Sequence, residues 1–480
     1  MRIVVLMGVA ALLSACAMGP DYSRPDIPVT DSFRMAGEEK DLPSLADMPW
    51  WELYRDEALQ KLIRISLEEN KDLERAVATV EEFEARLFIA RTDYAPQMTA
   101  TANGPVVRRG GVRFPGFANP FNYYLQGNLA WEIDVWGRIR RSNEAARADL
   151  LAREDNRRAI VLQLVGGVAQ SYFDLRQFDL QLEIAERTLK AWNESVRISQ
   201  ARHRQGLIDR LDVEQFQAER ENAAARIADL KRQMIQKENE LSVLLGRNPG
   251  QIPRGLSLTG QMMPPVVPAG LPSELLQRRP DIVQAEQQLA AATARIGAAK
   301  ADRFPKISLT GTLGIANPSL SKLFTPGGDF GVLGPGLTGS LLNAQALGFQ
   351  QDAAEAQARQ AVAQYKQTIL VAFKEVEDAL VGVSTAREQE AAQDRQVNAL
   401  QAALRLANLR YKGGLANYLD VLIAQRNLFE AELALTSTHR LQLVSVVQLY
   451  KALGGGWSPL DTAQQQPGQA PAEPGKAGRG

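Results

Sequence analysis

The sequence predicts a mainly α-helical, internally duplicated chain with a small β part, and three observations carry this prediction. First, residues 202–213 and 410–421 share Arg, Gly, Leu, Leu, Asp and Val in place, at a spacing of 208 residues. Second, apolar residues recur with helical spacing through about 138–204. Third, short alternating runs follow Pro96 and Pro305, which is typical of strands.

The repeat divides the chain into two copies of one unit. Other residues agree at the same spacing, for example Ala145 with Ala353. Agreement at so many positions predicts two repeats, residues 50–250 and 270–456, joined by a linker at 251–269.

Each repeat is expected to contain a helix, two strands, a very long helix and a return helix. The helices are expected at about 56–94, 138–204 and 211–246 in the first repeat, and at about 281–302, 346–412 and 419–453 in the second. The strands are expected at Gln97–Ala102, Phe121–Gln126, Lys306–Leu313 and Gly331–Leu342, with loops rich in glycine and proline at 104–120 and 314–328.

The first long helix has the apolar seam of a coiled coil. Its apolar side chains follow steps of four and three, with one slip near Phe178. Those side chains are Val161, Val165, Val168, Tyr172, Leu175, Leu182, Ala185, Leu189, Trp192 and Val196. A helix over 138–204 would be roughly 100 Å long, which is far longer than a globular enzyme uses.

The first residues predict an exported lipoprotein. Arg2 precedes the apolar run Ile3–Leu13, which is too short to span a bilayer and is typical of a cleaved export signal at 1–15. The sequence Leu-Ser-Ala-Cys that ends at Cys16 resembles the lipobox of bacterial lipoproteins, which implies that Cys16 is acylated. The residue after Cys16 is Ala17 and not an aspartate. In bacterial lipoproteins, this pattern implies sorting onward to the outer membrane. The alternative is an ordinary signal with Cys16 as a stray thiol.

Composition argues against several classes of function. The 480 residues include 55 basic and 55 acidic side chains, so the zero net charge does not favour a nucleic-acid partner. The chain has two histidines, His203 and His439, and one cysteine, Cys16. We therefore expect no metal site, no catalytic residues, no enzymatic activity, and no cofactor beyond a covalent lipid on Cys16. After the signal, no segment reaches eighteen uninterrupted apolar residues.

The strands predict the oligomeric state. A membrane crossing without apolar helices requires strands closed into a barrel, because an open sheet edge leaves backbone groups unpaired in lipid. Four strands per chain cannot close around water, whereas three chains supply twelve, an even number within the range of transmembrane barrels. We therefore expect a homotrimer, with a 12-stranded transmembrane β-barrel continued by a long α-helical barrel.

Three stretches resemble a known family. The run Trp131 to Arg141 is similar to the strand-to-helix signature of outer membrane factors, the TolC/OprM-like family, and Arg-Tyr-x-x-Gly at 410–414 fits the same family. Cys16 to Pro25 is similar to the mature start of its lipoprotein branch, often called NodT-type. The resemblance covers residue 16 to about 456.

That resemblance implies the outer-membrane channel component of a tripartite efflux or secretion system. Such a protein is a passive exit duct for drugs or other small molecules, anchored by lipid in the outer membrane and extending into the periplasm. The implied partners are a periplasmic adaptor (membrane fusion) protein and an inner-membrane transporter of the RND type.

The resemblance also assigns roles to the hairpin tips. The tips are implied to lie at the periplasmic end and to meet the adaptor, through Gly206, Leu207, Gly413, Gly414 and Leu415. Carried over by position, Tyr411 and Asp212 match a tyrosine and an aspartate that tie neighbouring helices in the closed state. Asp420 matches an acidic ring that lines the constriction.

Two positions depart from the family pattern. The second aspartate of the ring is Ile423 here, and an arginine found in the gate of some members is Ala416. We therefore expect closure to be held differently, through Arg210 or by apolar contact at Ile423. The alternative for Asp212 and Asp420 is that they are the N-caps of their return helices, and both roles can hold together.

Aromatic residues flank the expected strands. These are Tyr123, Tyr124, Trp131 and Trp136. They fit either a belt at the membrane interface or core packing, and the sequence leaves both interpretations open.

Rival functions fit the sequence less well. A periplasmic membrane-fusion adaptor lipoprotein is the main alternative, but adaptors carry one helical hairpin with extensive β sequence, and this chain has two hairpins and few strands. A lipid-anchored hydrolase would need a catalytic triad or a metal cluster, and a coiled-coil scaffold would not need strand pairs. An extended leader at 16–49 and a disordered tail at 457–480 complete the expected organisation.

Overall fold

The computed structural model describes residues 17–30, 32–34, 44–104, 123–261, 272–339 and 344–455. The expected signal at 1–15, Cys16 and the expected tail at 457–480 lie outside the described residues. The chain forms two compact units, and each combines segments of both repeats. Unit 1 is Met1–Ile27, Val77–Asn156 and Val283–Thr368, and unit 2 is Pro28–Ala76, Arg157–Ile282 and Ile369–Gly480.

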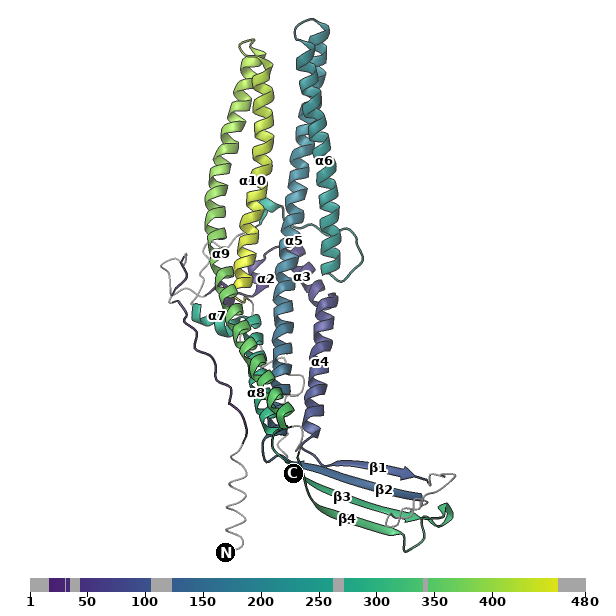
Figure 1. The fold of residues 1–480 in the computed structure, drawn as a ribbon. Helices are drawn as coiled ribbons and strands as arrows, with labels where there is room; N and C mark the ends of the chain where they lie inside the picture. The colour runs from purple at the N-terminus through teal and green to yellow at the C-terminus, as the bar shows by residue number, and fades with distance from the viewer. Residues whose placement is uncertain are drawn as a thin grey trace, which may run out of the picture. The chain divides into compact units, whose positions relative to one another are not determined.

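Unit 1 contains one antiparallel sheet of four strands, which lie side by side in Figure 1. The strands are β1 (Gln97–Asn103), β2 (Tyr123–Ile133), β3 (Lys306–Asn317) and β4 (Asp329–Thr338), in the order β1-β2-β3-β4. β1 and β4 are therefore the edges of the sheet, and each has one row of backbone groups without a partner strand among the described residues.

The pairing register preserves the duplication. Gln97 of β1 pairs with Ala130 of β2, and Lys306 of β3 pairs with Thr338 of β4. The second pairing is the first one advanced by 209 residues on one strand and by 208 on the other. The two hairpins are thus two copies of one structure, as the sequence spacing predicts.

The expected strands exist, but their bounds differ. β3 continues to Asn317, through residues that were expected to begin a loop, and β2 continues to Ile133. Glycine is the reason for the first error: Gly314 lies inside β3, where a Cβ would come within 2.7 Å of Leu125 O, so glycine permits close packing here and does not mark a turn. The expected strand residues Phe121, Asn122 and 340–342 lie outside the described residues.

The described leader, residues 17–27, is bound to unit 1 by charged contacts. Arg24 donates two hydrogen bonds to Glu286, at 2.8 and 2.6 Å, and Glu286 is only 7% exposed. Arg141, which is 5% exposed, donates to Asp21 at 2.7 Å. Bidentate arginine–carboxylate contacts with buried partners hold their geometry well, so this segment has a defined path along the helices.

Four long helices dominate the rest of the chain (Figure 1). They are α5 (Arg138–Arg204), α6 (Arg210–Leu244), α9 (Ala344–Lys412) and α10 (Tyr418–Ala452). Every predicted end lies within two residues of the observed one. α6 and α10 each have 35 residues and are displaced by 208 residues, which confirms the duplication again.

Shorter helices lead into the strands and the core. They are α2 (Trp50–Leu53), α3 (Glu57–Glu69), α4 (Lys71–Thr92), α7 (Pro272–Arg278) and α8 (Pro280–Ala301), with 3-10 turns η1 (Leu45–Asp47), η2 (Leu258–Gly260) and η3 (Leu320–Lys322). α4 ends before Pro96 and α8 before Pro305, as expected. The single helix predicted over 56–94 is wrong, because the chain breaks at Asn70.

Asn70 breaks that helix by hydrogen bonding in two directions. Its Oδ1 accepts from the backbone nitrogens of Asp72 and Leu73, which caps α4. Its Nδ2 donates to Leu244 O at 2.9 Å, and so occupies a free carbonyl at the end of α6. Asparagine therefore joins the start of one helix to the end of another, and periodicity could not show this.

The core of unit 2 confirms the coiled-coil seam. Val168, Tyr172 and Leu175 on α5 are completely buried, and Val376, 208 residues after Val168, is completely buried on α9. These residues belong to one cluster with side chains of α3, α6 and α10. Phe178, at the predicted slip, packs instead in a separate cluster with other residues of α5 and α6.

A buried carboxylate organises one end of this core. Asp56 is 1% exposed and caps α3 by accepting from Ala58 N at 2.9 Å. It also accepts from Tyr172 Oη at 2.8 Å, Leu256 N at 2.9 Å and Gln261 Nε2 at 2.8 Å. Burial by itself would raise the pKa of Asp56, but these hydrogen bonds outweigh burial and lower it. The linker expected at 251–269 is thus packed against the core where the structure describes it.

We predict that Asp56→Ala destabilises unit 2. The change removes a helix cap, worth about 1 kcal/mol, and leaves buried donors unpaired, which costs about 1–3 kcal/mol. The free energy of unfolding, measured by urea titration in detergent, should fall by roughly 3 kcal/mol at neutral pH. Because the pKa of Asp56 is lowered on folding, its contribution disappears as the pH falls through that pKa, so the variant should lose less stability in acid than the parent does. Asp72→Ala, at an exposed surface position, is the control; an equal loss in both variants would contradict the assignment.

Candidate functional site

The turns that end the long helices have the same geometry in both repeats. Gly206 and Gly414 have φ of +70° and +72°, the left-handed region that favours glycine. Leu207 N donates to Arg202 O at 3.0 Å, and Leu415 N donates to Arg410 O at 2.9 Å. This pattern is the Schellman motif, in which a glycine ends a helix and the next residues bond back to its last turn. The sequence prediction of two equivalent breaks is confirmed.

The loops at the two tips present apolar side chains to solvent. Leu207 is 66% exposed and Leu415 is 75% exposed, and Gly413 beside it is also exposed. A single exposed leucine is ordinary on a protein surface, so the notable feature is that it recurs at the same place in both loops.

Below the tips, an aromatic cluster connects all four long helices. Trp192 of α5 and Phe216 of α6 are each 1% exposed, with ring centroids 6.2 Å apart. Phe216 packs edge-on against Tyr418 of α10 at 4.2 Å, and Tyr418 packs edge-on against Tyr411 of α9 at 4.4 Å. Burial raises the pKa of Tyr418. We call these four residues the aromatic cluster.

Arg202 of α5 contacts the aromatic cluster at Tyr411. Its guanidinium lies over the Tyr411 ring at 4.5 Å from the centroid, and its Nη1 donates a hydrogen bond to the Tyr411 hydroxyl. Sequence reasoning selected Tyr411 but expected Asp212 as its partner, and it did not select Arg202, Trp192 or Phe216. The duplication contained a signal for Arg202, since Arg410 occupies the equivalent position.

Asp212 and Asp420 lie in the first turns of α6 and α10. The alternative that they are N-caps is wrong: the N-caps are Asp209 and Asn417, and Asn417 accepts from Leu419 N at 3.4 Å. The expectation failed because Asp212 and Asp420 are each the third residue of their helix. From sequence alone, an aspartate at that position looks like an N-cap. In the first turn both carboxylates still lie at the positive end of a helix dipole.

The other selected residues lie on accessible helix surfaces. Asp420 is exposed and Ile423, one turn along α10, is 40% exposed, so both occupy one face of that helix. Arg210 begins α6 and pairs with Glu214 at 3.2 Å. Arg210 therefore interacts within its own helix in this chain, and any role in closure belongs to an assembly.

The residues around the strands are not core residues of this chain. Tyr123, Tyr124 and Trp136 are partly exposed, and Trp131 is 36% exposed. Trp136 stacks on Phe304 at 4.8 Å and donates to Pro305 O at 2.9 Å. These exposures do not support core packing, which was one of the two interpretations that the sequence left open.

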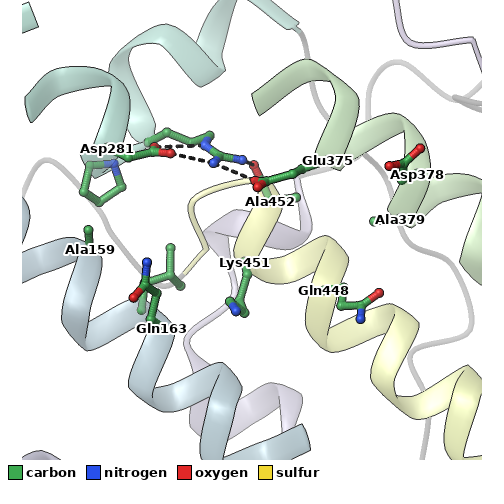
Figure 2. Close-up of a pocket in the computed structure, with 12 residues that line it drawn as sticks. Ala159, Gln163, Asp281, Glu375, Asp378, Ala379, Gln448, Lys451 and Ala452 are labelled. Atoms are coloured by element: carbon green, nitrogen blue, oxygen red, sulfur yellow. Dashed lines mark hydrogen bonds and ion pairs between the residues drawn. The ribbon is translucent and has the colours of Figure 1, made fainter. Parts of the chain in front are cut away.

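A polar cavity of about 500 Å³ lies among α5, α8, α9 and α10, as Figure 2 shows. Arg279, 6% exposed, bonds there to Asp281 at 2.7 Å, to Glu375 at 2.7 Å and to Ala452 O at 3.0 Å. Burial alone would lower the pKa of Arg279, but the two carboxylates raise it. Arg279 thus joins the start of α8 to α9 and to the end of α10. Asn70 is the equivalent residue in the first repeat.

Lys451 enters the same cavity across a glycine. A Cβ on Gly166 of α5 would lie 2.2 Å from Lys451 Cδ, so α5 and α10 approach closely here because position 166 has no side chain. Burial lowers the pKa of Lys451, Glu375 opposes this shift and Arg279 adds to it. Within the described residues, no group of three or more histidine, cysteine, aspartate or glutamate side chains is placed to hold a metal ion. The contacts of Arg279 in this cavity connect α8, α9 and α10.

Among the helices in the described part of the chain, none is both long enough and apolar enough to cross a membrane.

Comparison with known proteins places this architecture in one family. A family model described as outer membrane efflux protein matches residues 62–247 and again residues 271–455, once on each repeat. The probable efflux pump outer membrane protein TtgC of Pseudomonas putida is 37% identical over 470 residues, which is 96% of each chain. The cation efflux system protein CusC of Escherichia coli O6:H1 is 35% identical, over 94% of this chain and 97% of that protein.

Solved structures agree with this placement. The Neisseria gonorrhoeae MtrE outer membrane channel in its open state superposes with a TM-score of 0.83 and 34% identity, over 92% of this chain and 98% of that one. The outer-membrane channel OprN gives a TM-score of 0.85 and 29% identity, over 92% of this chain and all of that one. Because the family model covers both repeats and the relatives match over nearly their whole length, the chain belongs to the outer membrane efflux protein family.

Proposed function

We propose that this protein is the outer-membrane channel component of a tripartite efflux system, a passive exit duct for drugs or other small molecules. The observation that carries the proposal is the match of both repeats to the outer membrane efflux protein family, together with relatives that act in efflux pumps. The adaptor alternative has no comparable support, since the solved outer-membrane channels OprN and MtrE superpose on 92% of this chain.

The duct is a homotrimer in this proposal. In the part of the chain that the structure describes, the sheet edges β1 and β4 are unpaired, and such edges are stable in lipid only when they pair with another sheet. Three sheets joined edge to edge form a closed barrel of twelve strands, which needs no further partner. The exposed apolar residues on the sheet, such as Val332 (73%) and Leu337 (72%), fit a lipid-facing surface.

We predict that the detergent-extracted protein has about three times the chain mass of 52.7 kDa, before the detergent is counted. The mass should be measured by light scattering with detergent correction, and the trimer should form ion-conducting pores in planar bilayers. A monodisperse monomer with its full β content, or a trimer that does not conduct, would contradict the proposal.

In this proposal, the lipid anchor lies beside the junction of β2 and α5. Met18 N donates to Trp136 O at 3.1 Å, and a Cβ on Gly137 would lie 3.0 Å from Ala17 Cα. The leader therefore begins where β2 passes into α5, one residue after Cys16. An acyl chain on Cys16 would enter the bilayer next to the strands, which supports acylation of Cys16 and location in the outer membrane.

We predict that Cys16 incorporates labelled palmitate and that Cys16→Ala abolishes the incorporation, because Cys16 is the one cysteine in the chain. Outer-membrane fractions of the variant should still contain some protein, since the strands also insert. Asp21→Ala, which removes a leader contact and keeps Cys16, should retain the label. Label that persists in Cys16→Ala would show that the lipid is elsewhere.

The tips are the proposed docking surface for the periplasmic adaptor, through Gly206, Leu207, Gly413, Gly414 and Leu415. Their support is the matched pair of exposed leucines on two identical turns. The adaptor in turn would connect the duct to an inner-membrane transporter of the RND type, which supplies the energy and selects the substrate. The duct itself needs no cofactor beyond its lipid.

We propose that closure of the aperture depends on the aromatic cluster and on Arg202, with Asp212, Asp420, Arg210 and Ile423 nearer the pore axis. The contact between Arg202 and Tyr411 joins the two hairpins of one chain. A hydrogen bond is worth about 0.5–1.5 kcal/mol net, and a cation–π contact at an exposed site about 0.5–1 kcal/mol. Contacts of this strength suit a switch, because they hold one state without making it permanent.

We predict that Arg202→Ala shifts the balance toward the open state by about 1–2 kcal/mol per chain, since both contacts are lost. Single-channel conductance in planar bilayers should rise, and large antibiotics such as vancomycin should enter cells. Tyr411→Phe keeps the cation–π contact and should have a smaller effect. Asp420→Ala should instead reduce cation selectivity without opening the pore, because it removes a charge and no contact. Unchanged conductance in Arg202→Ala, with opening in Ile423→Ser, would show closure by apolar contact.

A further inference from the structure

The cavity beside Arg279 contains a lysine without a counter-ion. Lys451 of α10 is half-buried, and no carboxylate among the described residues forms an ion pair with it. Its alkyl stem lies against α5, because Gly166 has no side chain there. Burial lowers the pKa of Lys451, which is the effect expected for an ammonium group that water solvates poorly. An anionic partner would therefore stabilise the charged form of this side chain.

Glu375 of α9 provides the opposite charge in the same cavity. Its Oε2 pairs with Arg279 at 2.7 Å, and its Oε1 forms no hydrogen bond with the described residues. Arg279 also pairs with Asp281, so two carboxylates share one guanidinium and a net negative charge remains. Glu375 opposes the lowering of the pKa of Lys451, but the two side chains do not form an ion pair. The cavity thus offers one unpaired cation and one excess negative charge.

Two amide side chains line the mouth of the cavity. Gln163 of α5 and Gln448 of α10 are exposed, so a molecule can enter from solvent. In the view of Figure 2, Lys451 lies between these two amides and below Asp281 and Glu375. An amide can donate to a carboxylate and accept from an ammonium group. The volume of about 500 Å³ lies within the range of small-molecule sites, about 300–1,000 Å³.

The first repeat is an internal comparison for this cavity. Of the five charged residues that line the cavity, only Asp281 has a charged equivalent, Asp72. The equivalents of Arg279, Glu375, Asp378 and Lys451 are Asn70, Gly167, Gln170 and Val243. The first repeat therefore makes the same connection between helices without these charges. Because ion pairs of buried side chains add little to stability, their presence in one repeat alone indicates a role in binding.

We propose that the cavity binds a small zwitterion of the amino-acid type, with its carboxylate on Lys451 and its ammonium group on Glu375. The two charges of such a molecule complement the unpaired cation and the excess negative charge together. A simple anion would be repelled by Glu375, and a simple cation would be repelled by Lys451. The proposal goes beyond export, because a passive duct needs no site of this kind.

The test is isothermal titration calorimetry on the full-length, detergent-extracted protein. The zwitterionic probes are L-glutamine, L-alanine and glycylglycine, and the comparison probes are acetate and methylammonium, which each carry one of the two charges. We expect at least one zwitterion to bind with a millimolar or lower Kd, since the carboxylates are partly exposed to water. The same zwitterion should raise Tm, because it binds the folded state. Acetate and methylammonium should bind about tenfold more weakly.

Substitutions connect the binding to the named charges. Lys451→Gln and Glu375→Gln should each weaken the zwitterion roughly tenfold, because each removes a charge-assisted contact. Gly166→Ala keeps every charge but should also weaken binding, since the added Cβ would lie 2.2 Å from Lys451 Cδ and displace that stem. Lys71→Gln is the matched control. Lys71 is an exposed lysine at the equivalent of Pro280, which lines the cavity, and its loss should leave binding unchanged.

The outcomes are distinct, and the Tm of each variant without a probe reports whether that variant folds. Zwitterion binding that weakens in Lys451→Gln and Glu375→Gln and is kept in Lys71→Gln supports the proposal. Acetate that binds as tightly as the zwitterions would overturn the role of Glu375 and the proposed ligand class. Binding that persists in both cavity variants, or no binding by any zwitterion, would overturn the site itself. Efflux is tested separately, by the conductance of the trimer.

Discussion

The constraint on which this protein depends is that one chain cannot pair all of its own repeat surfaces. In a duplicated chain, one surface of the first repeat packs against the opposite surface of the second repeat. The two outer surfaces, one on each repeat, are left without such a contact among the described residues. The sheet shows this constraint directly: β2 pairs with β3 at the junction of the repeats, while β4 and β1 are left as edges. The helices show it again, since Gln181 of α5 is buried at the junction and its equivalent on α9, Gln389, is exposed. Two separate parts of the described chain thus leave repeat surfaces exposed at the ends of the duplication.

Within each chain, the repeats use different chemistry to solve the same structural problem. The end of each return helix must be joined to the start of the helix that precedes the strands. Asn70 makes this join in the first repeat with neutral hydrogen bonds, and Arg279 makes it in the second with two carboxylates and a carbonyl. In the second repeat, a polar cavity lies beside Arg279. In the first repeat, the residue equivalent to Lys451 is Val243, which is 66% exposed. This divergence gives equivalent positions in the two repeats different charge.

Much of this architecture could be predicted from the sequence, because the long helices are specified locally. Glycines at 206 and 414 end two of them, and the apolar seam of α5 continues for many turns with one slip near Phe178, so the predicted ends agree within two residues. The strands were less predictable, since Gly314 serves close packing inside a strand and resembles a loop residue in sequence. The break at Asn70 and the pairing of Tyr411 with Arg202 depend on residues more than 170 positions away, and no local pattern contains such information.

The position of each contact along the hairpins determines how they can part. Trp192 and Phe216 are almost fully buried, and separating them exposes large apolar surfaces, which costs a few kcal/mol for each ring. Arg202 and Tyr411 lie nearer the tips, where water can replace a lost hydrogen bond. The resistance to separation therefore falls from the aromatic cluster toward Gly206 and Gly414. The aromatic cluster that joins the four helices is therefore the part of the hairpins whose separation would cost most.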